Sequence, residues 1–415
     1  MESFCNMEKH TDIAIIGGGA SGLAAAVSAK MNGNVRVEIL EKYPRTGKKL
    51  LATGNGRCNL YNENASCDKF FGAKAFARHA LTTFDKDAFF ASVGLEIKVN
   101  ENGLAYPLSN QAGAVLDCLR FTCQEAGVTE TTDFQVSKIE GKKGKFKITS
   151  VNGDVVFAKR VILATGSMAQ PKLGGNNAFQ TLLKPLGHSF QKCLPALSYL
   201  KTNPNDVGGL KGMKYQGEIA LFEGEKEIAK ETGEILFSEN GVSGIAAMQL
   251  SLYAANPLSK GKPLFLKMSP LPMNKAEAER FLEKRKNLFP DRTLDEFLTG
   301  VVAKRIAQAA FKRAGVTPLS RCASTLTSDE IQKTAKELTE WICPVTGIGG
   351  FDVCQVMLGG ADTKDFDDKT MESRILPGLY AAGELLDVTG PCGGYNLTWA
   401  WASGTLAGRM AAISL

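Results

Sequence analysis

The stretch DIAIIGGGASGLAAAV at residues 12–27, followed by VRVEILE at residues 35–41, decides the fold. An apolar strand runs into the pattern Gly17-x-Gly19-x-x-Gly22, and an alanine-rich helix and a second strand follow. In such a βαβ unit the glycines permit a tight turn, close approach of a pyrophosphate and close packing of the helix on the strand. Glu41 ends the second strand, where it can accept hydrogen bonds from a ribose diol. These residues predict a dinucleotide site, with the helix N-terminus facing the phosphates.

Later segments decide which dinucleotide is expected. The glycine-rich, cationic loop GKKLLATGNGRCN at residues 47–59 can wrap a pyrophosphate and reach a flavin ring. Two buried strands end in small residues, VILATG at 161–166 and GLYAAGE at 378–384. A helix expected to begin near Asn396 can direct its N-terminus at the flavin and stabilise the anionic reduced ring. Together these segments favour FAD over NAD as the bound cofactor.

The residues expected to contact FAD lie at the strand ends and turns just described, with the backbone near Val136 placed at the adenine. They are Gly17, Gly19, Ala20, Ser21, Gly22, Glu41, Lys42, Lys48, Gly54, Gly56, Arg57, Cys58, Asn59, Val136, Thr165, Gly166, Gly383, Glu384, Asp387, Gly394, Tyr395, Asn396 and Leu397.

The pairing of residues 47–59 with GLYAAGELLDVTGPCGGYNLTWAWASG at 378–404 resembles one flavoprotein family. That family includes aminoacetone oxidase-like enzymes and bile-acid ene-reductase-like enzymes of gut bacteria. The resemblance covers nearly the whole chain. It implies an α/β fold with FAD bound by a Rossmann-like domain in two sequence pieces, and an inserted β-barrel with a small helical domain.

The chain departs from the family pattern in two segments. Glu239-Asn240 and Ile245 stand where relatives usually carry a Thr-His pair and a proline around a Gly-x-Ser-Gly turn. Met357-Leu358-Gly359-Gly360 replaces a frequent Thr-Ala-Gly-Gly. Both segments are expected on the substrate side, so the departures leave FAD binding intact and the substrate open.

Length and pattern predict the domain organisation. At 415 residues the chain is too long for one small core. We expect a first FAD-binding piece at 1–190, a barrel at 191–270, a helical insert at 271–325, a return helix with barrel completion at 326–357, and a second FAD-binding piece at 358–415.

Local patterns predict particular elements. A three-stranded meander is expected at Asp133–Glu140, Lys145–Val151 and Val155–Ala158, and short barrel strands include Glu225–Lys230 and Gly233–Ser238. Helices are expected at Lys275–Leu288 and Leu294–Ala314, the second opened by a capping box formed by Thr293 and Glu296. A further capping box, Thr327 with Glu330, opens the return helix.

Composition narrows the class of protein to which the chain can belong. Hydrophobic residues make up 44% of the chain, charged residues 22%, and the net charge is +6. Ten cysteines without a C-x-x-C pair read as reduced thiols, and the scattered His10, His79 and His188 argue against a metal site. No signal-peptide pattern or membrane-length apolar run is present, so we expect a cytoplasmic location without membrane contact.

Three functions remain open. The leading one is a reductase: NADH or NADPH, as a transient co-substrate, reduces FAD, which passes hydride to a C=C bond conjugated to a carbonyl in a hydrophobic, steroid-like or bile-acid-like substrate. Tyr395, Arg57 and Asn59 are candidates to polarise the carbonyl or supply the proton. The second is an aminoketone oxidase using oxygen. The third is a non-catalytic or RNA-associated flavin-binding protein, disfavoured because no dedicated basic tail is visible, so no nucleic-acid partner is expected. The sequence leaves the oligomeric state undetermined.

Overall fold

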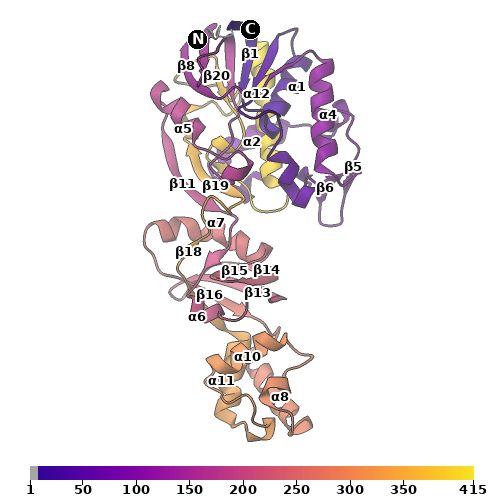
Figure 1. Ribbon diagram of the computed structural model, residues 1–415, viewed down its shortest axis with the longest axis vertical. Coiled ribbons are helices and arrows are strands. Elements are labelled where there is room, and N and C mark those ends of the chain that lie inside the picture. The colour runs from indigo at the N-terminus through magenta and orange to yellow at the C-terminus, as the bar shows by residue number, and fades with distance from the viewer. Residues whose placement is uncertain (1–7) are drawn as a thin grey trace, which may run out of the picture. The chain divides into compact units, whose positions relative to one another are not determined.

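The computed structural model describes residues 8–415, which form two compact units (Figure 1). The first unit comprises the chain up to Leu194 together with Val356–Leu415. The second unit is Pro195–Gln355, which spans most of the residues predicted as barrel, helical insert and return segment. The first unit is Rossmann-like, because its parallel strands alternate with helices.

The sheet of the first unit brings five strand ends to one edge. Its parallel core consists of β7 (Thr129–Thr131), β2 (Val37–Leu40), β1 (Glu8–Ile16), β10 (Val155–Leu163) and β20 (Leu379–Ala381), in that order. Their carboxyl ends align, since the last residue of β1 pairs with the last residues of both β2 and β10. A ligand site is expected at this edge, where the strands of an α/β sheet end.

The predicted meander is fused to this sheet. β8 (Val136–Lys142) pairs antiparallel with β9 (Lys145–Ser150), and β9 in turn pairs antiparallel with the first half of β10. The expected separation between Val155–Ala158 and the strand that follows is wrong, because β10 runs through without a break. The charged residues in its middle stay in the strand because Lys159 pairs with Asp12 and Arg160 hydrogen-bonds Ser414.

Two helices of the first unit pack with unusually small separation. α1 (Ala20–Met31) and α12 (Tyr395–Ile413) meet through small residues. A Cβ placed on Gly404 would lie 2.3 Å from the carbonyl oxygen of Ser21, and one on Gly408 would lie 2.1 Å from that of Ala25. The last helix of the chain therefore rests directly on the helix that begins at the glycine turn.

The other elements of this unit surround the sheet and its carboxyl edge. They are η1 (Leu50–Gly56), β3 (Tyr61–Asn62), η2 (Cys67–Lys69), β4 (Phe71–Gly72), α2 (Lys74–Thr83), α3 (Lys86–Ser92), β5 (Ile97–Val99), β6 (Leu104–Pro107), α4 (Ala112–Glu125), η3 (Pro171–Leu173), α5 (Ala178–Leu183), η4 (Lys184–Leu186), η6 (Thr363–Asp365), η7 (Gly383–Leu385) and β21 (Val388–Thr389). β11 (Phe190–Ala196) pairs with β19 (Val356–Ala361) where the chain leaves and re-enters.

The second unit contains the expected small barrel. Its antiparallel ladder includes β16 (Leu264–Ser269), β13 (Lys214–Glu223), β14 (Lys226–Ser238), β15 (Gly241–Ser243) and β12 (Leu200–Lys201). Successive short strands then join its two ends: β17 (Trp341–Val345) pairs with β16, and β18 (Gly347–Ile348) pairs with β12. The ladder thus returns on itself.

Two local predictions in this unit need correction. The strands expected at Glu225–Lys230 and Gly233–Ser238 are a single strand, β14, because Gly233 pairs in register with Gly217 and does not form a turn. A further helix, α7 (Ile245–Ser259), was not expected, and α6 (Pro204–Val207) is a single short turn. α7 buries an alanine- and leucine-rich face in the barrel core.

The helices of the insert are partly as expected. α8 (Lys275–Leu288) matches its prediction, but the helix expected at Leu294–Ala314 is divided into α9 (Leu294–Phe297) and α10 (Lys304–Arg313). The division falls at Gly300, whose φ of +82° is left-handed. The Thr293 capping box is also wrong, because its hydroxyl bonds the Glu296 carboxylate and not the helix backbone.

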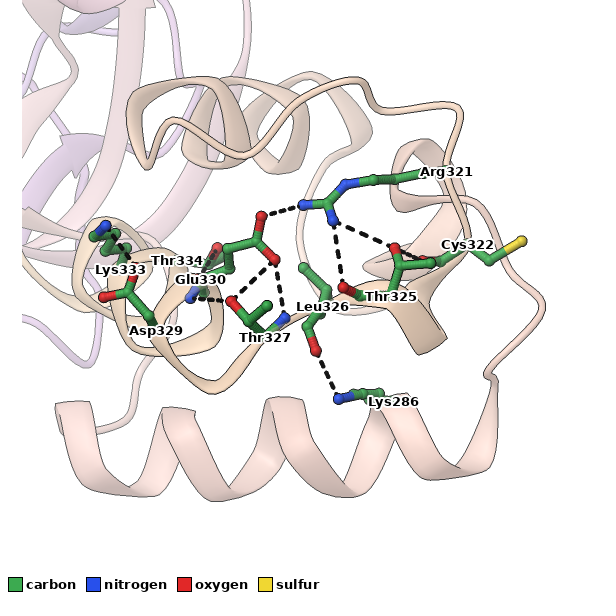
Figure 2. Close-up of polar contacts among 10 residues, drawn as sticks. All are labelled: Lys286, Arg321, Cys322, Thr325, Leu326, Thr327, Asp329, Glu330, Lys333 and Thr334. Atoms are coloured by element: carbon green, nitrogen blue, oxygen red, sulfur yellow. Dashed lines mark hydrogen bonds and ion pairs between the residues drawn. The ribbon is translucent and has the colours of Figure 1, made fainter.

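The second capping box is present in α11 (Ser328–Thr339), as Figure 2 shows. The Thr327 N–H donates to the Glu330 carboxylate at 2.9 Å, and the Glu330 N–H donates to the Thr327 hydroxyl at 3.2 Å. Arg321 also donates to Glu330, while Lys286 on α8 donates to the Leu326 carbonyl at 2.6 Å. These bonds fix the start of α11 against α8.

Candidate cofactor site

Two glycines in the turn after β1 are closely packed, and a third borders open space. A Cβ on Gly17 would lie 2.5 Å from the Ala164 carbonyl oxygen, and one on Gly22 would lie 1.9 Å from the Gly17 carbonyl oxygen. Gly17 also has a φ of +105°, which side chains rarely adopt. Nothing lies within 4 Å of a Cβ built on Gly19. Gly17 and Gly22 therefore hold the turn together, and Gly19 leaves one face of it open.

The first turn of α1 offers free donors to that open face. The first backbone bond of the helix runs from Leu23 N–H to the Gly19 carbonyl at 2.9 Å. The N–H groups of Ala20, Ser21 and Gly22 precede it and have no carbonyl within the helix to bond. The first turn carries no acidic residue, so the positive end of the helix dipole is not offset. A pyrophosphate fits this position.

Glu41 clamps the glycine turn to the end of β2. Its carboxylate accepts the Gly18 N–H at 2.9 Å and the Tyr43 N–H at 3.0 Å, and the residue is buried. Each carboxylate oxygen keeps a second lone pair that a ribose hydroxyl can use. Phe134 donates its N–H to the Glu41 carbonyl at 2.8 Å, which places Val136, the expected adenine contact, two residues from this contact.

The two lysines expected at the cofactor have other contacts. Lys42 donates to the Gly174 carbonyl at 2.7 Å, and burial lowers its pKa. Lys48 is exposed and lies over the ring of Tyr43, 4.2 Å from its centre. Both ammonium groups thus lie beside the ring of Tyr43, in the segment after Glu41.

Two buried side-chain oxygen atoms without a hydrogen-bond partner lie at the neighbouring strand ends. In the part of the chain that the structure describes, the Thr165 hydroxyl after β10 and Oε1 of Glu384 after β20 are buried without a hydrogen-bond partner. Gly166 has a φ of +72° and open space where a Cβ would stand. Buried polar atoms rarely stay unpaired. FAD, which carries hydroxyl groups along its ribityl chain, fits these residues.

Lys49 joins this group, although the sequence pattern did not single it out. Its ammonium donates to Oε2 of Glu384 at 2.7 Å, and both side chains are largely buried. Gly383, just before Glu384, is fixed by α12: its N–H donates to the Ser403 hydroxyl and its carbonyl accepts from the Trp399 indole. No local spacing reveals contacts between residues 335 positions apart.

The loop over η1 is held in an uncommon backbone conformation. Gly54, Asn55, Gly56 and Cys58 all have φ between +55° and +82°. Such conformations cost energy in residues other than glycine and concentrate at functional sites. Cys58 is fully buried, and burial raises its pKa to about 11, so its thiol stays protonated at neutral pH. No atom lies within 4 Å of the position that a Cβ on Gly56 would take.

The three catalytic candidates differ in their free hydrogen-bonding capacity. The Tyr395 hydroxyl donates to the Asn64 carbonyl at 3.3 Å. Asn59, with its amide turned to satisfy both ends, donates to the carbonyls of Tyr61 and Ala105 and accepts from the Gly394 N–H. Both side chains therefore hold the loop to the start of α12.

Arg57 is exposed and keeps donors free. Its Nε donates to the Gly54 carbonyl at 3.3 Å, and the guanidinium lies over the ring of Tyr106, 5.0 Å from its centre. Within residues 8–415, its terminal nitrogens form no hydrogen bond or ion pair. Among the three candidates, Arg57 is thus the one that can offer N–H groups to a further molecule.

The start of α12 presents its own free donors. The first backbone bond joins Thr398 N–H to the Gly394 carbonyl, so the N–H groups of Tyr395, Asn396 and Leu397 have no partner within the helix. The Asn396 side chain is used locally, since it accepts from the Gly390 N–H and donates to its carbonyl, both at 2.8 Å. The helix end can still stabilise negative charge on a bound ring.

Three other predicted positions lie in packed surroundings. Asp387 accepts a backbone bond from Gly359, and burial raises its pKa. Met357 and Leu358 are buried, so this departure from the family pattern changes packing inside the first unit.

In the described residues, no group of histidine, cysteine and carboxylate side chains can hold a metal ion, and no helix has the length and hydropathy of a membrane span.

Comparisons with known proteins identify relatives over nearly the whole chain. The model of the HI0933-like protein Rossmann domain matches residues 11–410. The 3-dehydro-bile acid delta(4,6)-reductase of Clostridium scindens is 36% identical over 96% of this chain and 98% of its own length. The ribosomal RNA dihydrouridine synthase of Escherichia coli is 28% identical over 94% of this chain and 96% of its own length.

Solved structures share the fold at low sequence identity. A flavocytochrome c3 fumarate reductase in its open conformation gives a TM-score of 0.50 at 15% identity, covering 98% of this chain and 78% of that one. A quinol-fumarate reductase with menaquinol also gives 0.50 at 14% identity, covering 98% and 71%. The chain therefore belongs to the HI0933-like family of FAD-binding Rossmann proteins and is a flavin-dependent oxidoreductase.

Proposed function

We propose that this protein is an FAD-dependent reductase of a C=C bond conjugated to a carbonyl, and that its substrate is a steroid or bile-acid-like enone. The observation that carries the proposal is the 36% identity, over 96% of the chain, to a protein named as a bile-acid delta(4,6)-reductase. NADH or NADPH is proposed as the reductant, visiting the flavin transiently.

The proposed cofactor contacts follow the free groups of the first unit. The N–H groups at the start of α1 would bind the pyrophosphate, Glu41 the adenosine ribose, and Thr165 with Glu384 the ribityl hydroxyls. FAD supplies the hydride that the reaction needs, and the start of α12 would stabilise the negative charge of the reduced ring.

Arg57 is proposed to polarise the substrate carbonyl. Its guanidinium has terminal N–H groups that bond no other group of residues 8–415, whereas the Tyr395 and Asn59 donors are bonded to backbone carbonyls. A donor at the carbonyl oxygen stabilises the negative charge that forms when hydride reaches the conjugated carbon. The buried Cys58 is less suited, because its thiol is enclosed by protein.

A second candidate acceptor shares the same chemistry. The Escherichia coli relative is named a ribosomal RNA dihydrouridine synthase, and the reduced bond of a uracil ring is also conjugated to a ring carbonyl. The expectation that no nucleic acid is bound therefore lacks support from the comparisons. The rRNA-named relatives share 27–28% identity with this chain, less than the bile-acid reductase, so the steroid-like substrate is preferred.

The test follows the flavin absorbance of the purified holoenzyme without oxygen. Bleaching by NADH or NADPH supports the reductase, whereas bleaching only by aminoacetone replaces it with the oxidase. The reduced enzyme is then mixed with a 3-oxo-Δ4 steroid or with ribosomal RNA that lacks dihydrouridine. Reoxidation by the steroid alone supports the proposed substrate; reoxidation by the RNA alone assigns the second candidate, and reoxidation by neither rejects both.

A further inference from the structure

We propose that Lys49 is a cofactor-positioning residue, which acts by holding Glu384 so that its free oxygen Oε1 faces the FAD ribityl chain. This inference rests on the proposed FAD site and adds a residue that neither the glycine pattern nor the family resemblance singled out. The bridge between Lys49 and Glu384 joins the 47–59 loop to the turn after β20 at 2.7 Å.

The lysine side of the bridge is fixed by its loop. The Gly47 N–H donates to the Gly18 carbonyl at 2.8 Å, so the loop is bonded to the glycine turn two residues before Lys49. A Cβ on Gly47 would lie 2.2 Å from Cδ1 of Leu116, which shows how closely the loop packs on α4. The Lys49 ammonium therefore starts from a backbone that has little freedom to move.

The glutamate side is fixed by two helices. Gly383 is bonded through both its N–H and its carbonyl to α12, by Ser403 and Trp399. A Cβ on Gly383 would lie 2.5 Å from the hydroxyl oxygen of Ser21, in the first turn of α1. Glu384 is thus held beside the helix end that is expected to bind the pyrophosphate.

Charge explains why Glu384 needs a partner there. A carboxylate beside a diphosphate site repels the ligand unless a cation offsets its charge, and a charge left unpaired in a largely buried position is costly. Lys49 engages Oε2 and leaves Oε1 buried and without a partner. The lysine thereby neutralises the carboxylate and orients its remaining acceptor toward the cofactor.

The test is a double-mutant cycle on the dissociation constant of FAD, measured by titrating apoprotein and following flavin fluorescence. Since the pair is neither fully buried nor exposed, we expect Lys49→Met to weaken FAD binding by about tenfold. Glu384→Gln should weaken it by about fivefold through the loss of a charged acceptor. The double variant should bind FAD more tightly than Lys49→Met alone, because the uncompensated charge is gone.

The control is Lys9→Met. Lys9, whose side chain is about as exposed as that of Lys49, pairs with Glu38 at 3.2 Å near the amino ends of β1 and β2. This variant should bind FAD within about twofold of wild type, and Lys49→Arg should restore most of the affinity lost in Lys49→Met. Wild-type affinity in Lys49→Met would overturn the proposal, as would losses in the double variant equal to the product of the single losses. A wild type that binds FAD but reduces no enone refutes the proposed function and leaves this cycle interpretable.

Discussion

Replacing Glu41 by glutamine tests how the glycine turn is held. The carboxylate accepts two backbone N–H groups, from Gly18 at 2.9 Å and Tyr43 at 3.0 Å, in a buried position. Glutamine has the same shape but one oxygen, so its NH₂ group must face one of these N–H groups. Losing one hydrogen bond to a charged acceptor, with a buried donor left unpaired, costs about 1.5–3 kcal/mol.

The assay is the melting temperature of the apoprotein, followed by FAD titration. For a unit of this size the loss corresponds to a decrease of about 3–10 °C in melting temperature. Glu41→Ala, which removes both acceptors, should melt lower still and bind FAD more weakly than the glutamine variant. Glu140→Gln is the control, because Glu140 makes an exposed pair with Lys138 on β8. If Glu41→Gln melts within 1 °C of wild type, the two hydrogen bonds to Glu41 do not stabilise the glycine turn as argued.

Three further predictions address chemistry, pH and packing. Arg57→Ala should lower kcat for enone reduction by about 10²-fold while the bound-flavin spectrum is retained, since one donor to a developing oxyanion is lost; unchanged kcat with saturating substrate would exclude the role. Burial lowers the pKa of His188, whose Nε2 lies 2.8 Å from the Ser373 hydroxyl, so its neutral form stabilises the fold above its ordinary pKa and that stability is lost as the pH falls below it. The melting temperature should therefore fall less between pH 7.5 and 5.0 in His188→Asn than in wild type, and equal falls would contradict this. Gly404→Ala should cost about 1–3 kcal/mol by forcing α12 away from the Ser21 carbonyl, with an accompanying loss of FAD affinity; chemical denaturation with near wild-type midpoints would refute the close packing.

Much of the fold was predictable because its signals are local. The glycine pattern, the alanine-rich helix and Glu41 lie within one short stretch and specify a βαβ unit by themselves. The capping box at Thr327 formed as expected, since both partners belong to the same helix turn. The similar pattern at Thr293 failed because its hydroxyl bonds the Glu296 carboxylate and not the helix backbone. The helix expected to follow was divided at Gly300, which has a left-handed backbone.

The candidate site was predictable only in part, because many of its contacts join distant segments. Small residues at strand ends indicated Thr165 and Glu384, and both carry unpartnered buried atoms. Lys49 was missed in favour of the neighbouring Lys48, since sequence alone does not show which of two adjacent lysines turns inward. Tyr395 and Asn59 looked reactive by residue type, but their polar atoms bond the backbone of other segments.

The contact between α1 and α12 has a consequence for biosynthesis. Ser28 on α1 hydrogen-bonds the carbonyl of Thr405 on α12, 377 positions later. A ribosome must therefore translate the whole of Pro195–Gln355 before α12 can pack on α1. Domains tend to fold as units during synthesis. The intervening barrel can thus fold first, and the FAD site lacks one of its two helices until the segment that forms α12 has been synthesised.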